Sequence, residues 1–166
     1  MKPNYRRPLY PSCNKGYNFT DPSGSDDYQD RPARMKALGG ASAQPLRHLD
    51  FLIHEPERSV LLTKGGVPVT IPRAERYAVH KLIVSVERQD QAKAAKDILQ
   101  AATLVSALAI RRPLELANAW ATAWDGGPRW KDKLEAGRAR LPEAARTALA
   151  DVLARAVGAK QRRKRT

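Results

Sequence analysis

The segment 48–84 constrains the fold of this chain most, because a hairpin signal is followed directly by a helix signal. Aliphatic and β-branched residues in the segment 60–71 flank the pair Gly65-Gly66. Adjacent glycines supply the positive φ angles of a tight turn, so this part predicts a β-hairpin. Pro72 then stands where the first turn of a helix tolerates a missing N–H.

The segment 48–54 reads His-Leu-Asp-Phe-Leu-Ile-His and predicts one more strand ahead of the hairpin. A carboxylate inside such an apolar strand needs a partner, a place at the sheet edge, or a metal ion. Asp50 is therefore either the partner of Arg47 or Lys81, or a metal ligand. His48 and His54 would share its face of the strand, but two imidazoles and one carboxylate splayed along a single strand rarely close around one ion.

Beyond Pro72 the apolar spacing is helical, and prolines, glycines and cations separate successive helices. The three tryptophans (Trp120, Trp124 and Trp130) are spaced for packing between helices rather than for base stacking. We expect helices from Pro72 to about 86, from 95 to 112, from 113 to 124, from 130 to 136 and from 142 to about 156, with a core that includes Leu82, Ile83, Ile98, Leu99, Leu149 and Leu153.

The chain divides by composition into four parts. An irregular segment rich in Pro, Gly and Ser is expected over 1–44, because few of its apolar residues recur at any period. The strand region follows over 45–71, a helical domain over 72–157 and a basic tail over 158–166. The predicted fold class is α+β, a small antiparallel or mixed sheet followed by a C-terminal helical bundle.

The charge of the chain predicts an anionic partner. The net charge is +13, of which five charges belong to the tail, so the remainder carries +8. A tail of this kind binds polyanions without reading sequence, or simply aids solubility. A single cysteine and the lack of a membrane-length apolar run or a signal peptide predict a cytoplasmic protein of bacterial type. The five tail cations are Lys160, Arg162, Arg163, Lys164 and Arg165.

The predicted helix after Pro72 carries four cationic or titratable side chains within two turns: Arg73, Arg76, His80 and Lys81. Such a row could bind the phosphates of a nucleotide or an RNA, because Arg offers a bidentate fork and Lys a point charge. The alternative is a solvated face balanced by Glu75 and Glu87.

Several blocks occur in an order that resembles a bacterial family with the nucleotidyltransferase fold, the superfamily of DNA polymerase beta. They are Gly24-Ser25-Asp26-Asp27-Tyr28, Pro32-Ala33, the segments 37–40 and 45–53, and the segment 72–83 followed by Lys96-Asp97. The resemblance implies transfer of a nucleotidyl group from a nucleoside triphosphate to an RNA or protein acceptor. It also implies Mg²⁺, with Asp50 as the third metal-binding carboxylate and as a catalytic residue.

The superfamily signature, a Gly-Gly or Gly-Ser turn followed by an Asp-x-Asp strand, is absent from this sequence. The chain is therefore similar to the C-terminal portion of such a protein. Two metal ions need several carboxylates, so we expect the chemistry to be absent or to depend on another polypeptide. The alternatives are a non-catalytic basic module that binds RNA or a toxin or antitoxin partner, and the product of a broken gene.

Overall fold

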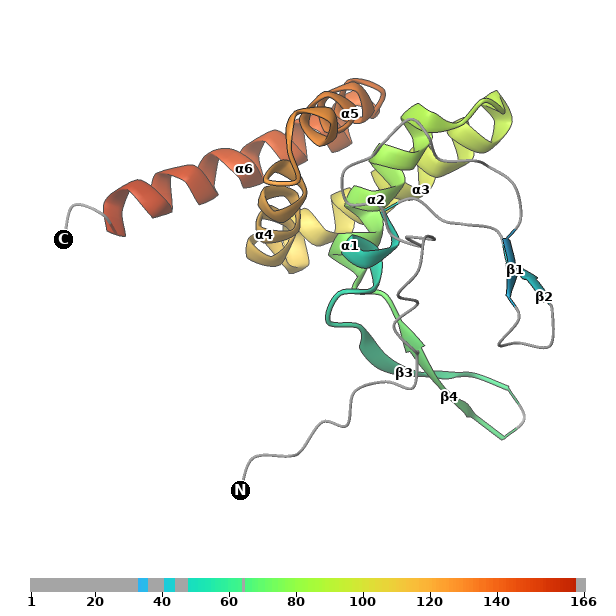
Figure 1. Ribbon diagram of the computed structural model, residues 1–166. Helices are drawn as coiled ribbons and strands as arrows, with labels where there is room; N and C mark the ends of the chain where they lie inside the picture. Colours follow the sequence, from blue (N-terminus) through green and yellow to red (C-terminus); the bar gives the residue numbers. More distant parts are fainter. Residues whose placement is uncertain (1–32, 36–40, 44–47, 64, 164–166) are drawn as a thin grey trace.

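The structure, a computed structural model, describes residues 33–35, 41–43, 48–63 and 65–163 (Figure 1). Two separate two-stranded antiparallel sheets are followed by a bundle of helices, which confirms the predicted α+β class with a C-terminal helical bundle. In chain order the elements are β1 (Ala33–Met35), β2 (Ala41–Ala43), α1 (Leu49–Ile53), β3 (Glu57–Leu61), β4 (Val67–Ile71), α2 (Ala74–Glu87), α3 (Gln91–Arg111), α4 (Pro113–Trp124), α5 (Pro128–Ala139) and α6 (Glu143–Arg163).

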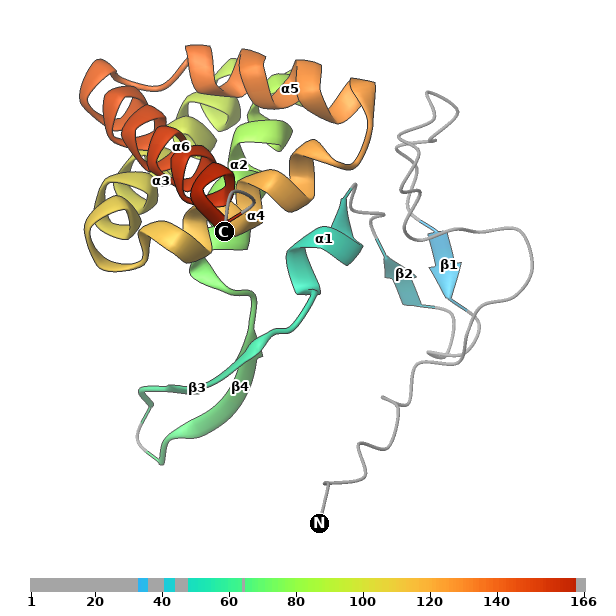
Figure 2. The same ribbon diagram turned by 90° about the vertical axis from the view of Figure 1, so that its left-hand side faces the viewer.

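The predicted hairpin is confirmed as β3 and β4. Leu61 pairs with Val67 at the turn and Glu57 with Ile71 at the open end. Gly66 takes the positive φ of 65° and donates its N–H to the carbonyl of Thr63. The hairpin extends away from the helical bundle in both views (Figures 1 and 2).

The strand predicted over 48–54 is wrong, because Leu49–Ile53 form the short helix α1. The N–H of Leu52 donates to the carbonyl of His48 at 3.2 Å, and the two buried residues, His48 and Phe51, are three positions apart. That spacing places both side chains on one face of a helix, against the bundle. A short apolar run has no periodicity of its own that separates a strand from one buried helical turn.

Helix α2 lies at the centre of the bundle and contacts α1, α3, α4 and α5, while α6 packs against α3 and α4 (Figure 2). Its apolar stripe, Ala78, Val79, Leu82 and Ile83, is fully buried. The core therefore runs from α1 to α6.

Helices α2 and α5 approach each other closely at Gly137. A Cβ atom at this position would lie 2.6 Å from the carbonyl oxygen of Leu82, so only glycine fits. The close contact brings the last turn of α2 within reach of the polar side chains of α5.

Most of the predicted core is correct. Leu82, Ile83 and Leu149 are fully buried, and Ile98 and Leu153 are half-buried against the core. Leu99 is the exception, since 66% of its surface is exposed. Asp97 marks the side of α3 that faces α2, because its carboxylate binds Lys81. Ala101 and Leu108 are buried at helical spacing from Asp97, whereas Leu99 lies on another side of the helix.

The helix boundaries follow the sequence signals. The carboxylate of Asp90 caps α3 by accepting from the N–H groups of Ala92 and Lys93, and Pro113 opens α4. Helix α6 continues to Arg163, beyond its predicted end near residue 156. The packing role of the tryptophans is confirmed: Trp120 and Trp130 are buried, and Trp124 stacks on Trp120 with ring centroids 6.4 Å apart.

Candidate functional site

The four residues predicted to bind phosphate all lie on α2 or at its start, and the structure gives them separate surroundings. Arg73 precedes the first turn of α2, and its Nε donates to the carbonyl of Glu55 at 2.8 Å. Its guanidinium also lies 3.8 Å from Glu57 and 3.9 Å from Glu75.

Arg112, between α3 and α4, joins the same two acids. Its guanidinium nitrogen lies 3.3 Å from Glu57 and 3.9 Å from Glu75. The Glu75 side chain is only 4% exposed, so its charge needs these two cations. The four residues link the base of the hairpin to α2 and to the start of α4.

Arg76 holds α1 against α2. It donates to the carbonyl of Phe51 at 3.3 Å, and its guanidinium carbon lies 5.1 Å from the centroid of the Phe51 ring. Burial lowers the pKa of Arg76, and the neighbouring Arg73 acts in the same direction, while the charges of Glu55 and Glu75 oppose the change. The side chain works as a cation–π and hydrogen-bonding group between two helices.

Lys81 binds a carboxylate of α3. Its Nζ lies 2.6 Å from Oδ1 of Asp97, and Nε of Arg88 lies 3.1 Å from Oδ2 of the same residue. Burial raises the pKa of Asp97, but the hydrogen bonds and charges of Lys81 and Arg88 outweigh it, and the net pKa is lowered. Lys81 also lies 5.2 Å from the centroid of the Tyr77 ring.

His80, the last of the four, is buried within α2. The four side chains therefore have different surroundings. Arg73 belongs to a cluster with glutamates, Arg76 contacts α1, His80 is buried and Lys81 forms an ion pair with α3. Phosphate binding by Arg73, Arg76, His80 and Lys81 stays a prediction.

Asp50 lies exposed in the first turn of α1 and not in a strand as predicted. His48 is buried at the N-cap of α1, whereas His54 is exposed at its C-cap. Within the described part of the chain, no group of three or more His, Cys, Asp or Glu side chains could hold a metal ion. The residues described do not fit a two-metal site, and Asp50 as a metal ligand stays a prediction.

Glu87, treated in the sequence only as balancing charge, is the centre of a polar contact between α1, α2 and α5. Lys133 of α5 donates to its Oε1, and Nε2 of His48 lies 3.3 Å from the same atom. Burial raises the pKa of Glu87, but hydrogen bonds from His48 and Lys133 and their charges lower it to about 2. The His48 ring also packs edge-on against Trp130, with centroids 4.4 Å apart.

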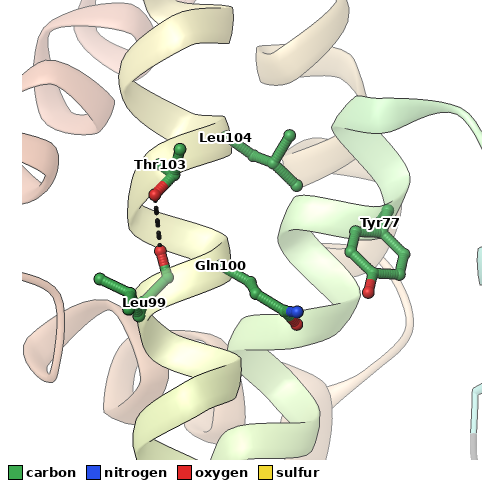
Figure 3. A pocket seen from close by; sticks show the side chains of 5 residues that line it. All are labelled: Tyr77, Leu99, Gln100, Thr103 and Leu104. Carbon is green, nitrogen blue, oxygen red and sulfur yellow. Dashed lines mark hydrogen bonds between the residues drawn. The ribbon is translucent and has the colours of Figure 1, made fainter.

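A hollow of about 340 Å³ opens between α2 and α3 (Figure 3). Its lining is mainly apolar and includes the side-chain oxygen of Gln100, which is buried without a hydrogen-bond partner in the described residues. The other lining residues are Tyr77, Leu99, Thr103 and Leu104.

The tail cations lie partly in α6. Lys160, Arg162 and Arg163 belong to its last turns, while Lys164 and Arg165 lie outside the described residues. No helix in the part of the chain that the structure describes is long and apolar enough to cross a membrane.

The fold and these contacts define a small α+β protein whose helical bundle is held by buried acids with cationic partners. Comparison with protein families gives a match. The model of a family described as nucleotidyltransferase matches residues 19–125. The match spans well over half of the chain, so this chain belongs to that nucleotidyltransferase family. Comparisons with curated proteins and with solved structures give no significant match.

The polar residues that sequence reasoning missed are Glu75, Glu87 and Asp97 as partners in buried ion pairs. Glu75 and Glu87 stand at the two ends of α2, where their charge looks like that of an ordinary exposed helix. Their helical spacing from the apolar stripe is the one available signal, because Glu75 lies three and four residues before Ala78 and Val79. Arg73 stands close to Glu75 in the sequence. Other partners, Arg112, His48, Lys133 and Lys81, are too distant in sequence for a local pattern to reveal them.

Proposed function

We propose that this protein acts in nucleotidyl transfer as a substrate-binding component. The donor is a nucleoside triphosphate, the acceptor is an RNA or a protein, and the setting is the bacterial cytoplasm. The family match over residues 19–125 carries the proposal. A net charge of +13 supports an anionic substrate.

The catalytic step requires carboxylates beyond those of the bundle. Two Mg²⁺ ions would hold the triphosphate and activate the attacking oxygen, and they need several carboxylates that are free to bind them. Glu75, Glu87 and Asp97 are each already neutralised by Arg, Lys or His. Asp50 is exposed and is the remaining candidate from the resemblance. We therefore propose that transfer depends on a second polypeptide, and that the chain alone is inactive.

The test is incubation of the purified chain with labelled nucleoside triphosphates, Mg²⁺ or Mn²⁺, and RNA or protein acceptors. We expect no labelled product from the chain alone. Asp50→Asn serves as the probe of the proposed ligand, and Asp151→Asn, at an exposed position on α6, is the matched control. Product that forms with the natural chain and Asp151→Asn but disappears with Asp50→Asn would overturn the proposal of an inactive chain.

A second candidate, a non-catalytic RNA-binding module, is favoured by the +8 that remains after the tail charges are removed. Salt titration of RNA binding separates the two sources of charge, because each phosphate contact adds to the salt dependence. Deletion of residues 160–166 should leave a weaker, still salt-sensitive affinity, carried by Arg73, Arg76 and Lys81. Complete loss of binding on that deletion would contradict a role for α2.

The α2 substitutions need a folding control, because these cations also stabilise the bundle. Arg76→Ala and Lys81→Ala in the shortened chain should weaken RNA binding further while the far-UV circular dichroism is retained. Lys93→Ala is the matched control, since Lys93 is exposed and forms its ion pair with Asp90, the N-cap of its own helix, at 3.5 Å. An equal loss of RNA affinity in Lys93→Ala would mean that general charge, and not α2, carries the binding.

A further inference from the structure

The outward face of α3 is almost uncharged, which is unusual for the exposed side of a helix. It consists of positions on α3 that stay exposed although the helix contacts both α2 and α6. Two large apolar side chains lie on it, Leu99 with 66% and Ile110 with 83% of their surface exposed. Its residues are Ala92, Ala95, Lys96, Leu99, Thr103, Ser106, Ala107 and Ile110, and Lys96 carries the one charge among them.

Four residues of this face form a symmetric pattern. Leu99, Thr103, Ser106 and Ile110 follow one another at spacings of four, three and four, the a/d repeat of a helix-to-helix seam. Large residues stand at both ends and small ones in the middle, where they allow two helices to approach closely. In Figure 3 Gln100 and Leu104 point toward α2, whereas Leu99 and Thr103 lie farther from Tyr77, at the outer edge of the hollow.

A pattern that reads alike in both directions is complementary to itself when two copies run antiparallel. With a two-fold axis between Thr103 and Ser106, Leu99 of each copy meets Ile110 of the other. Lys96 lies one turn before Leu99, and the exposed Arg111 and Glu115 follow Ile110, so charges of both signs flank the apolar centre of the seam.

We propose that the protein forms a homodimer in which the outward faces of two α3 helices pack antiparallel. The occupant of each face is a second copy of this chain. The proposal does not depend on nucleotidyl transfer, and its test needs no substrate. It accounts for two of the most exposed aliphatic side chains on the described helices.

Light scattering after size exclusion, over a range of protein concentrations, measures the assembly of the full chain. We expect a dimer that dissociates on dilution. Leu99→Glu and Ile110→Lys should each weaken dimerisation about 100-fold or more, because each buries two unpaired charges per dimer. Val157→Glu is the control, since Val157 on α6 is 58% exposed and lies outside the proposed seam. A monomer at all concentrations, or dimers that survive both α3 substitutions, would overturn the proposal.

Mixing the two variants tests the antiparallel geometry. In a mixed dimer Leu99→Glu of one copy faces Ile110→Lys of the other, and the second contact keeps the natural Leu and Ile. We expect the mixture to form heterodimers although each variant alone is monomeric. Failure of the mixture to dimerise, with both variants folded by circular dichroism, would refute the antiparallel seam, because a parallel pair would bring Leu99 against Leu99.

Discussion

The sharpest prediction concerns Glu87, whose carboxylate joins three helices. Substitution by Gln keeps the shape of the side chain and removes the charge that faces Lys133 and His48. We expect Glu87→Gln to be less stable than the natural protein at neutral pH. The reason is that Lys133, with a side chain only 20% exposed, loses its counter-charge.

The magnitude follows from the pKa of Glu87, which folding lowers from 4.5 to about 2. At about 1.4 kcal/mol for each pKa unit, the shift corresponds to a ceiling of about 3 kcal/mol. The side chain of Glu87 is 14% exposed, so solvent screening reduces the expected loss to about 1–2 kcal/mol.

The pH dependence has a definite sign. Because the folded pKa is lowered, the stabilisation is complete above pH 4.5 and is lost as the pH falls toward 2. Glu87→Gln should therefore differ most from the natural protein near pH 7 and converge with it as the pH approaches 2.

Urea denaturation followed by circular dichroism, repeated at intervals between pH 7 and pH 3, measures both effects. Asp151→Asn, an exposed carboxylate in the middle of α6, is the control and should track the natural protein throughout. If the free energy of unfolding of Glu87→Gln falls with pH as steeply as that of the natural protein, the Glu87 contact does not stabilise the fold.

Three further predictions concern the packing and capping of the helices, and thermal and urea denaturation test each of them. Gly137→Ala should lower the free energy of unfolding by about 1–3 kcal/mol, because its Cβ meets the Leu82 backbone. The control, Gly158→Ala in open space on α6, should be neutral or stabilising, and equal effects of the two substitutions would refute the close approach. Leu99→Ala should change the stability of the monomer by less than about 0.5 kcal/mol, because Leu99 is exposed. Leu116→Ala should lower it by about 2–5 kcal/mol, because Leu116 is fully buried, and a reversed order would contradict the burial of these two residues. Asp90→Ala should cost about 0.5–2 kcal/mol through loss of the α3 cap, and an unchanged midpoint would argue against it.

The elements that could be predicted from the sequence are those with local causes. Gly65-Gly66 marks the hairpin turn, Pro113 marks the start of α4, and Arg111 ends α3 where cations favour the negative end of the helix dipole. Each of these effects acts within a few residues, so the local sequence pattern predicts it directly.

The features that sequence reasoning did not predict depend on partners far along the chain. Helix α1 forms where His48 and Phe51 meet Trp130, which lies about eighty residues later. Leu99 follows the apolar residue Ile98, and only the positions of α2 and α6 decide which of the two is turned inward. In the sequence Lys81 resembles a solvated cation, because its partner Asp97 lies 16 residues later, on α3.

The part of the chain that shares ancestry with the nucleotidyltransferase family and the part that folds together have different ends. The family match stops at residue 125, at the C-cap of α4, yet Trp130 covers His48 and Phe51 within the matched part. Leu134 and Leu149, on the last two helices, complete the same core. A fragment cut at the family boundary would open the side of α2 that Gly137 approaches. The stretch that the family matches therefore needs the two helices that follow it, α5 and α6, to keep water from its core.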